Sequence, residues 1–308
     1  MTAIDTLITL ANVRGSLDLR CQFQGDWALD HAQEASGVAP YHIVLAGHCR
    51  MELPDGRRIT LAAGDILVLP GGSGHVLLSN GARVAPSTPQ RILGGLLPVQ
   101  RFGDGVELDL LCGRFLYQRD SMLFAALPDH LLIAGSAFLN TAPLPSLVAL
   151  LRVEADLNQM AGQFIVNALS SALFALVMRA HLQNSTQIEG TLALLTDKRL
   201  GRVWQAMLDD PAHDWNVEAL AGLANMSRAT FIRTFSKLSG SSPWTLLTKV
   251  RMERAYGLVT RTQDGLSDIA VQVGYQSQAA FSKVFKDTYG CAPGQLRRSK
   301  EPVWPIRG

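Results

Sequence analysis

The sequence lacks the cysteine spacing, the long apolar run and the leader segment that mark several common classes of protein. Its four cysteines, at positions 21, 49, 112 and 291, form no CxxC pair and no Cys/His ligand run, which argues against a structural zinc finger. No apolar run approaches the roughly 20 residues of a membrane span. Residues 1–10 lack the basic start and apolar stretch of a signal peptide. We therefore expect a cytoplasmic protein with no membrane partner.

The small net charge of +2 conceals an asymmetry between the two parts of the chain. Residues 195–308 contain 16 Lys and Arg against 10 Asp and Glu, a net charge of +6. The remaining residues contain 12 against 16, a net charge of −4. A basic C-terminal part fits a polyanionic partner, because contacts to phosphates release counterions. At 308 residues, the chain is long enough for two or three domains.

One pattern occurs twice in the last third of the chain, fifty residues apart. Each copy has a serine, two phenylalanines, a glycine and a proline at matched spacing: Ser227, Phe231, Phe235, Gly240 and Pro243, then Ser277, Phe281, Phe285, Gly290 and Pro293. A short apolar helix precedes each copy. Two short helices joined by a tight turn are typical of a helix-turn-helix. The duplication therefore predicts a module that reads two adjacent major-groove segments of double-stranded DNA.

The predicted second helix of each copy presents an outer face toward DNA. At 100° per residue, with the phenylalanines inside, the candidate contacts are Arg228, Ala229, Ile232, Arg233, Gln278, Ala279, Ser282 and Lys283. Arg and Lys suit guanine or phosphate, and Gln suits adenine, while Arg228 at its helix start is better placed for phosphate. A helix from Ser242-Pro243 to about Thr260 would span about 26 Å, the order of length needed to set the two reading helices about 34 Å apart, one turn of DNA.

The first two thirds of the chain change character near residue 144. Residues 40–125 contain short apolar and β-branched runs separated by Pro, Gly and Asp turns, which predicts a small barrel or sandwich. Residues 144–183 have helical periodicity, interrupted near Met160-Ala161-Gly162. We expect these helices to form a homodimer interface. The predicted domains are a sensor and dimerisation domain at 1–185, a linker at 186–194 and a DNA-binding domain at 195–300.

The C-terminal region resembles the AraC/XylS family of transcription regulators. The most specific stretches are Val273-Gly274-Tyr275, residues 280–286 and Tyr289-Gly290-Cys291-Ala292-Pro293. Residues 64–75 fit the cupin pattern G-x5-P-x-G-x2-H, so the N-terminal region is similar to the cupin-type sensor domain of one branch of that family. The resemblance implies an α+β multidomain protein: a cupin-like β-barrel with a helical dimerisation segment, then an all-α double helix-turn-helix. It also implies promoter half-sites and RNA polymerase as partners.

The cupin resemblance raises metal binding as an alternative. Metal-binding cupins present His-x-His and Glu in a first motif and His in a second. Here His42 is the only match in the first motif, since His48 and Glu52 have the wrong spacing, and His75 is the match in the second. Three ligands are the usual minimum for a catalytic metal. We therefore expect structural histidines, no metal, no cofactor and no catalytic residue, which leaves a DNA-tethered cupin enzyme as the least favoured alternative.

The placement of two cysteines is similar to that in the reactive-chlorine-responsive regulators of this branch. Cys21 lies in the first strand region and Cys112 in a late strand. The resemblance implies that the two form an oxidation switch, in which a thiolate becomes a sulfenyl species and a nearby thiol traps it. Cys49 is an extra thiol, and Cys291 is expected to serve packing. The predicted function is oxidant-responsive transcription activation; the alternative is a regulator that binds a small molecule in the barrel.

Overall fold

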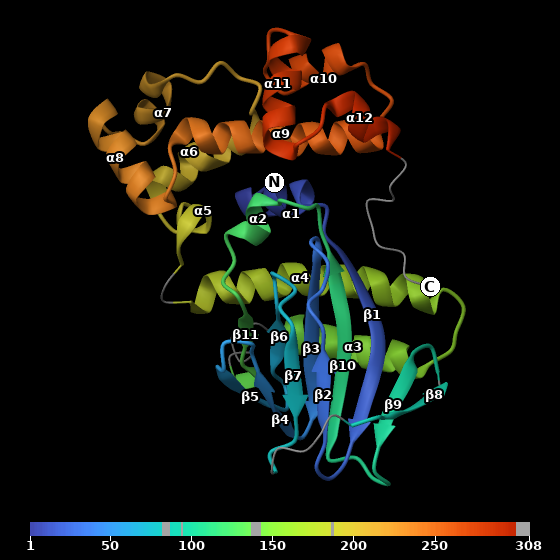
Figure 1. Cartoon of the computed structure of the whole chain (residues 1–308). Coiled ribbons are helices and arrows are strands. Elements are labelled where there is room, and N and C mark those ends of the chain that lie inside the picture. The colour runs from blue at the N-terminus through green and yellow to red at the C-terminus, as the bar shows by residue number, and fades with distance from the viewer. Residues whose placement is uncertain (82–86, 94, 137–142, 186–187, 300–308) are drawn as a thin grey trace. The chain divides into compact units, whose positions relative to one another are not determined.

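The computed structural model describes residues 1–81, 87–93, 95–136, 143–185 and 188–299 (Figure 1). Contacts divide the chain into two compact units. The β unit comprises Val13–Arg119 and Leu127–Ser185. The helical unit comprises Met1–Asn12, Asp120–Ala126 and Thr186–Gly308.

Two sheets form the β unit. Their strands are, in chain order, β1 (Arg14–Phe23), β2 (Ala28–His31), β3 (Val38–Ala46), β4 (His48–Glu52), β5 (Arg58–Ala62), β6 (Ile66–Val68), β7 (His75–Leu78), β8 (Gln90–Leu93), β9 (Pro98–Phe102), β10 (Leu108–Leu116) and β11 (Leu131–Ile133). The larger sheet has the order β11-β6-β3-β10-β1-β9-β8, and the smaller one β2-β7-β4-β5. In the larger sheet, β1 pairs with β9 in parallel and with β10 antiparallel.

Inward side chains of both sheets share one apolar interior. Phe23 and Leu110 contribute to it from the larger sheet, and Met51 and Leu77 from the smaller one. This arrangement agrees with the barrel or sandwich that the spacing of turn residues predicts. One of those turns requires glycine, because Gly64 between β5 and β6 has φ of +92°. Three of the four cysteines, Cys21 among them, lie in the same interior.

Helices α3 (Pro143–Asp156) and α4 (Gly162–Asn184) run across the long strands of the larger sheet (Figure 1). They confirm the predicted pair of helices and its break, where Ala161 has φ of 63°. Helix α4 packs on β1, β10 and α3, with Phe174 fully buried. By length and composition, α4 is apolar enough to cross a membrane. It does not stand out as an unbroken apolar run in the sequence, because Ser170 and Ser171 interrupt it. Its packed face makes it a core helix of the β unit.

Short helices build the helical unit. They are α1 (Ala3–Leu10), α2 (Met122–Ala125), α5 (Gly190–Ala193), α6 (Lys198–Asp209), α7 (Val217–Leu223), α8 (Arg228–Ser239), α9 (Pro243–Arg261), α10 (Leu266–Gln272), α11 (Gln278–Tyr289) and α12 (Pro293–Arg298). Helix α9 begins as predicted, because Ser242 caps it and Pro243 occupies its first turn. Its 19 residues extend about 28 Å between the two helix-turn-helix motifs.

Two segments of the predicted sensor domain belong to the helical unit instead. Helix α1 buries Leu7 and packs against α6 and α9, and α2 buries Leu123 and packs against α5 and α9. The predicted linker also differs, because α5 occupies part of it and buries Leu192 and Ala193; residues 186–187 lie outside the described residues. The physical reason is the same in each case: short apolar segments bury their side chains in the nearest available core, which local sequence does not identify.

Candidate DNA-binding surface and thiol–histidine cluster

Helix α8 is positioned by its two ends and its inner face. The Ser227 hydroxyl accepts a hydrogen bond from the Thr230 N–H at 3.3 Å, which satisfies one free donor of the first turn. Phe231 and Phe235 are fully buried and fix the inner face. Gly240 ends the helix with φ of 70°, a left-handed conformation that glycine adopts without a steric penalty.

Helix α11 repeats this design in the second motif. Ser277 accepts from the Ala280 N–H at 3.2 Å, Phe281 and Phe285 are fully buried, and Gly290 ends the helix with φ of 74°. Both phenylalanines pack with the buried residues of α9 and α10. The two predicted helix-turn-helix motifs are thus formed by α7 with α8 and by α10 with α11.

The predicted contact residues lie on the outer faces of these two helices. Seven of the eight are exposed, and Ser282 is half-buried: the exposed ones are Arg228, Ala229, Ile232, Arg233, Gln278, Ala279 and Lys283. Ile232 is 43% exposed, which leaves it free to contact a thymine methyl group. Their roles in reading bases remain predictions.

Two of these side chains already have partners within the helical unit. An Arg228 guanidinium nitrogen lies 2.5 Å from a Glu218 carboxylate oxygen. Both side chains are largely exposed, so the pair is worth no more than about 1 kcal/mol, and a phosphate can replace Glu218 at little cost. The Ser267 hydroxyl donates to Gln278 Oε1 at 2.7 Å, which holds the Gln278 amide while its NH₂ group stays available.

In the β unit, Cys21 and Cys112 lie on neighbouring antiparallel strands and face the same interior. In the register of β1 and β10, Cys112 is opposite Leu19 and Cys21 is opposite Leu110, so the thiols are diagonal neighbours. A hydrogen bond with Cys21 is the largest cause that raises the pKa of Cys112 well above its usual range, followed by burial. The fold thus brings together the two cysteines that the sequence analysis pairs.

A chain of polar contacts leads from Cys112 to a backbone carbonyl. Cys112 Sγ lies 3.1 Å from His42 Nδ1, His42 Nε2 lies 2.9 Å from His75 Nε2, and His75 Nδ1 lies 3.0 Å from the Ser73 carbonyl oxygen. Burial lowers the pKa of both histidines, His42 strongly, so both rings are neutral at pH 7.

The Ser73 carbonyl determines which atom donates in each of these three hydrogen bonds. Ser73 O only accepts, so His75 Nδ1 carries the proton and its Nε2 accepts. His42 Nε2 must then be the donor to His75, which leaves His42 Nδ1 as an acceptor. The thiol of Cys112 therefore donates to His42 Nδ1. This cysteine therefore has a neutral imidazole in direct contact as the acceptor of its hydrogen bond.

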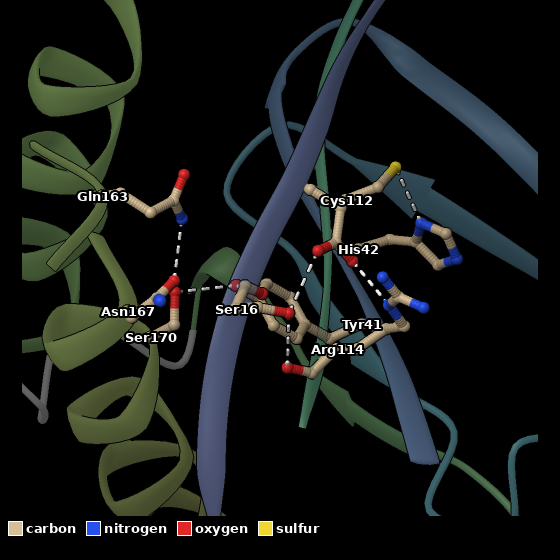
Figure 2. Close-up of polar contacts among 9 residues, drawn as sticks. Ser16, Tyr41, His42, Cys112, Arg114, Gln163, Asn167 and Ser170 are labelled. Carbon is tan, nitrogen blue, oxygen red and sulfur yellow. Dashed lines mark hydrogen bonds and ion pairs between the residues drawn. The ribbon is translucent and has the colours of Figure 1, made fainter. Parts of the chain in front are cut away.

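Tyr41, which precedes His42, lies on the other face of β3 (Figure 2). Its hydroxyl donates to the Ser16 carbonyl oxygen at 3.0 Å and lies 3.1 Å from the Ser170 hydroxyl on α4. Gly113 is required beside Cys112, since a Cβ there would lie 2.4 Å from the Tyr41 hydroxyl. Alternation along β3 thus directs His42 to the thiols and Tyr41 to the helix.

His31 is a third member of the histidine cluster and was missed by the sequence analysis. It is opposite His75 in the pairing of β2 with β7, and the two rings stack with centroids 4.6 Å apart. Burial, and then the neighbouring His75, lowers the pKa of His31 to about 4. From the sequence only His42 and His75 were candidate metal ligands, and in the structure a nitrogen of His31 lies within 4.8 Å of one nitrogen of each of them. His31 reaches His75 through the register of β2 with β7, and residue spacing in the sequence does not predict that register.

Two arginines near the cysteines in sequence are paired with carboxylates. Arg20 forms an ion pair with Asp109 at 2.5 Å and another with Asp156, while Arg114 lies 2.7 Å from Asp18. Each arginine is bound to carboxylates, and alternation along β1 also places Arg20 on the opposite face from Cys21. His42, rather than an arginine, is the group that faces Cys112.

A cavity of about 590 Å³ adjoins the histidine cluster. Its lining includes His31 and His75 together with Asp30, Glu52 and Arg58. The volume is within the range of small-molecule sites, and both charged and imidazole groups converge on it.

Comparison with known proteins matches both units. The cupin family model matches residues 3–183, and a helix-turn-helix domain model matches residues 220–299. The chain is 37% identical, over 97% of its length and 99% of the other protein, to an uncharacterised HTH-type transcriptional regulator of Haemophilus influenzae. It belongs to the AraC family of transcription regulators.

Two further relatives match the AraC-family architecture from end to end. The HTH-type transcriptional regulator MtrA of Neisseria gonorrhoeae is 34% identical over 97% of this chain and 98% of its own length. The RCS-specific HTH-type transcriptional activator RclR of Escherichia coli strain K12 is 29% identical over 99% of this chain and 100% of its own. The chain is therefore a DNA-binding transcription regulator with a cupin sensor domain, as predicted, and its relatives are named as regulators rather than enzymes.

Proposed function

We propose that this regulator is a cytoplasmic homodimer that activates transcription when oxidants such as hypochlorous acid link Cys21 to Cys112. The observation that carries the proposal is the diagonal placement of these two thiols on β1 and β10, facing one interior, together with the orientation of the Cys112 proton toward His42. A thiol must lose its proton to act as a nucleophile, and burial alone would prevent this. His42, which accepts the hydrogen bond of the Cys112 thiol, takes this proton only as the sulfur attacks the oxidant, because burial disfavours a stable imidazolium.

The proposed reaction balances with hypochlorous acid as the only oxidant. Cys112 transfers its proton to His42, and the thiolate attacks chlorine to give a sulfenyl chloride and hydroxide. The thiol of Cys21 then displaces chloride, forming the disulfide, and its proton combines with hydroxide to give water. His42 releases its proton to solvent. Two thiols and one hypochlorous acid thus yield one disulfide, water, chloride and a proton.

The disulfide would change how β1 pairs with β10. Diagonal neighbours in an antiparallel pair have Cα atoms about 7–8 Å apart, whereas a disulfide needs about 4.4–6.8 Å. Bond formation therefore requires these strands to shift. After β10 the chain enters the segment Asp120–Ala126 of the helical unit, where the Met122 N–H donates to Glu253 on α9 at 3.3 Å. We infer that this segment carries the shift to the helix that separates the two DNA-reading helices.

The test is DNA affinity before and after oxidation. A binding sequence selected from random duplexes is titrated with reduced protein, with protein treated with hypochlorous acid and with the same protein after reductant. We expect a reversible change of roughly 5–150-fold, the usual range of allosteric coupling. Cys21→Ser and Cys112→Ser should lose it, and Cys291→Ser, outside the β unit, should keep it. A full response in the Cys21→Ser/Cys112→Ser double variant contradicts the proposal.

Dimerisation is proposed from the outer surface of α3 and α4. Apolar side chains are exposed there at Leu150, Val153, Leu157, Met160 and Phe164, with Met160 at 96% and Phe164 at 77%. Exposed apolar patches of this kind mark association sites, and a second copy would cover them. A dimer would bind repeated half-sites with a strong dependence on salt. We also propose that the DNA-bound dimer recruits RNA polymerase.

The cavity beside His31 and His75 favours a second candidate function, in which a small molecule bound in the β unit is the effector. The two candidates give opposite results in one variant. A regulator that senses a ligand keeps its response in Cys21→Ser, while a thiol switch loses it.

A further inference from the structure

We propose that His31, His42 and His75 bind a late first-row divalent metal ion such as zinc, with one coordination position open toward the adjoining cavity. Each of the three histidines offers one ring nitrogen, and these three nitrogens lie within 4.8 Å of one another. The inference depends on neither thiol oxidation nor DNA binding.

The three rings converge from both sheets. His31 and His75 come from neighbouring strands of the smaller sheet, and His42 comes from β3 of the larger one. Zinc–nitrogen bonds of about 2.0–2.1 Å in a tetrahedral site place two ligand nitrogens roughly 3.4 Å apart. The 2.9 Å between the Nε2 atoms of His42 and His75 is close to that value, so a small rotation of side chains suffices.

His75 is already oriented for binding a metal. Its Nδ1–H donates to the Ser73 carbonyl oxygen, so its Nε2 lone pair is directed at the cluster. Hydrogen bonds of this kind fix the ring orientation of metal-binding histidines.

His31 gives independent evidence for a missing ligand. Its Nε2 is buried and has no hydrogen-bond partner among the described residues. A buried polar atom of this kind costs about 1–3 kcal/mol, so native structures seldom leave it unpartnered. Satisfied structural histidines, the expectation from the sequence, do not explain this nitrogen, whereas a coordinated metal does.

Metal binding would reverse the hydrogen bond between His42 and Cys112. In the structure, His42 Nε2 carries the proton and Nδ1 accepts from the thiol. Coordination through Nε2 moves that proton to Nδ1, which then donates to the sulfur 3.1 Å away. Cys112 thereby becomes the outer partner that fixes the orientation of His42, as partners of metal-bound histidines usually do. It is not a fourth ligand, since it contacts the opposite nitrogen of the ring.

The donor set selects the class of metal. Three imidazoles without a carboxylate suit zinc, copper, nickel or iron, and do not suit magnesium or calcium, which prefer oxygen ligands. Three protein ligands leave a fourth tetrahedral position, and the cavity lined by His31 and His75 gives water or a small ligand access to it.

The experiment is metal binding by tag-free, full-length protein that has been stripped with a chelator. Equilibrium dialysis against zinc, with elemental analysis, should give one ion per chain. Cobalt should give the visible absorption of a tetrahedral nitrogen site. His31→Ala and His75→Ala should each weaken binding at least about 100-fold. His48→Ala, which removes an exposed histidine of the same unit, is the matched control and should bind normally.

Circular dichroism on each variant separates loss of a ligand from loss of the fold. His31 is half-buried, so His31→Ala is the variant expected to keep the wild-type spectrum. Absence of zinc binding by the wild type, or binding that persists in both His31→Ala and His75→Ala, overturns the proposal. Because the experiment measures metal content, its result tests the metal site independently of the oxidation switch.

Discussion

Glu253 provides the sharpest prediction about stability. This carboxyl group lies on α9 in the helical unit, is only 3% exposed and accepts a hydrogen bond from the Met122 N–H. Its Oε1 has no partner among the described residues. Burial raises the pKa of Glu253 from 4.5 to about 7, against a smaller opposing effect from Met122 and Ser121. We predict that Glu253→Gln stabilises the helical unit at pH 8 and has little effect at pH 5.

The sign follows from proton linkage. Between pH 4.5 and about 7 the folded unit binds more protons at Glu253 than the unfolded chain does, so its free energy of unfolding falls as pH rises. The contribution is complete below pH 4.5 and lost above pH 7. A shift of about 2.5 pKa units, at about 1.4 kcal/mol each, gives roughly 3 kcal/mol as the upper limit at pH 8. Glutamine keeps the carbonyl acceptor for Met122 and removes the charge.

The assay is hydrogen exchange of α9 peptides in the full-length chain, corrected for the intrinsic exchange rate at each pH. We expect Glu253→Gln to exceed the wild type in free energy of opening by about 1–3 kcal/mol at pH 8 and by less than about 1 kcal/mol at pH 5. The control Asp287→Asn, on the exposed face of α11, should show no such dependence on pH. Destabilisation by Glu253→Gln at pH 8 refutes the reasoning, since it would mean that the charged form is the one the fold stabilises.

Two other predictions concern the proposed surfaces. Arg233→Ala or Lys283→Ala should weaken specific DNA binding by about 1–3 kcal/mol and relax the preferred sequence. The control Lys198→Ala, at an exposed residue outside both motifs, should leave affinity and specificity unchanged. Unchanged specificity in Arg233→Ala and Lys283→Ala would show that these residues do not read bases. Phe164→Asp should convert a dimer to a monomer in analytical ultracentrifugation with an unaltered circular dichroism spectrum, and a dimer that persists would place the interface elsewhere.

The elements that sequence predicted best are those with local signals. A serine cap, a glycine terminator and two inward phenylalanines lie within fourteen residues of each other in each copy of the repeat, so the bounds of α8 and α11 follow directly. The break between α3 and α4 was found the same way, from the interrupted periodicity at Met160-Ala161-Gly162. In each case, residues close together in the sequence are enough to predict where the helix begins or ends.

The features that sequence missed depend on contacts between distant residues. His31 joins His75 only through the register of two strands 44 positions apart in the chain, and no spacing rule gives that pairing. The apolar residues of α1 and α2 were visible, but which core they would enter was not. Arg20 and Arg114 are neighbours of Cys21 and Cys112 in sequence, but each arginine is bound to a carboxylate from a distant position, Asp109 and Asp18 respectively, which local sequence does not show.

The central claim is that Cys21 and Cys112 are the pair that oxidation links. The most direct test is non-reducing peptide mapping by mass spectrometry after a few equivalents of hypochlorous acid, with free thiols blocked and a reduced control alongside. The account predicts a Cys21–Cys112 crosslink that reductant reverses and that His42→Ala slows, because the acceptor of the Cys112 proton is gone. Free thiols at both positions, or random oxidation that includes Cys49, would contradict it.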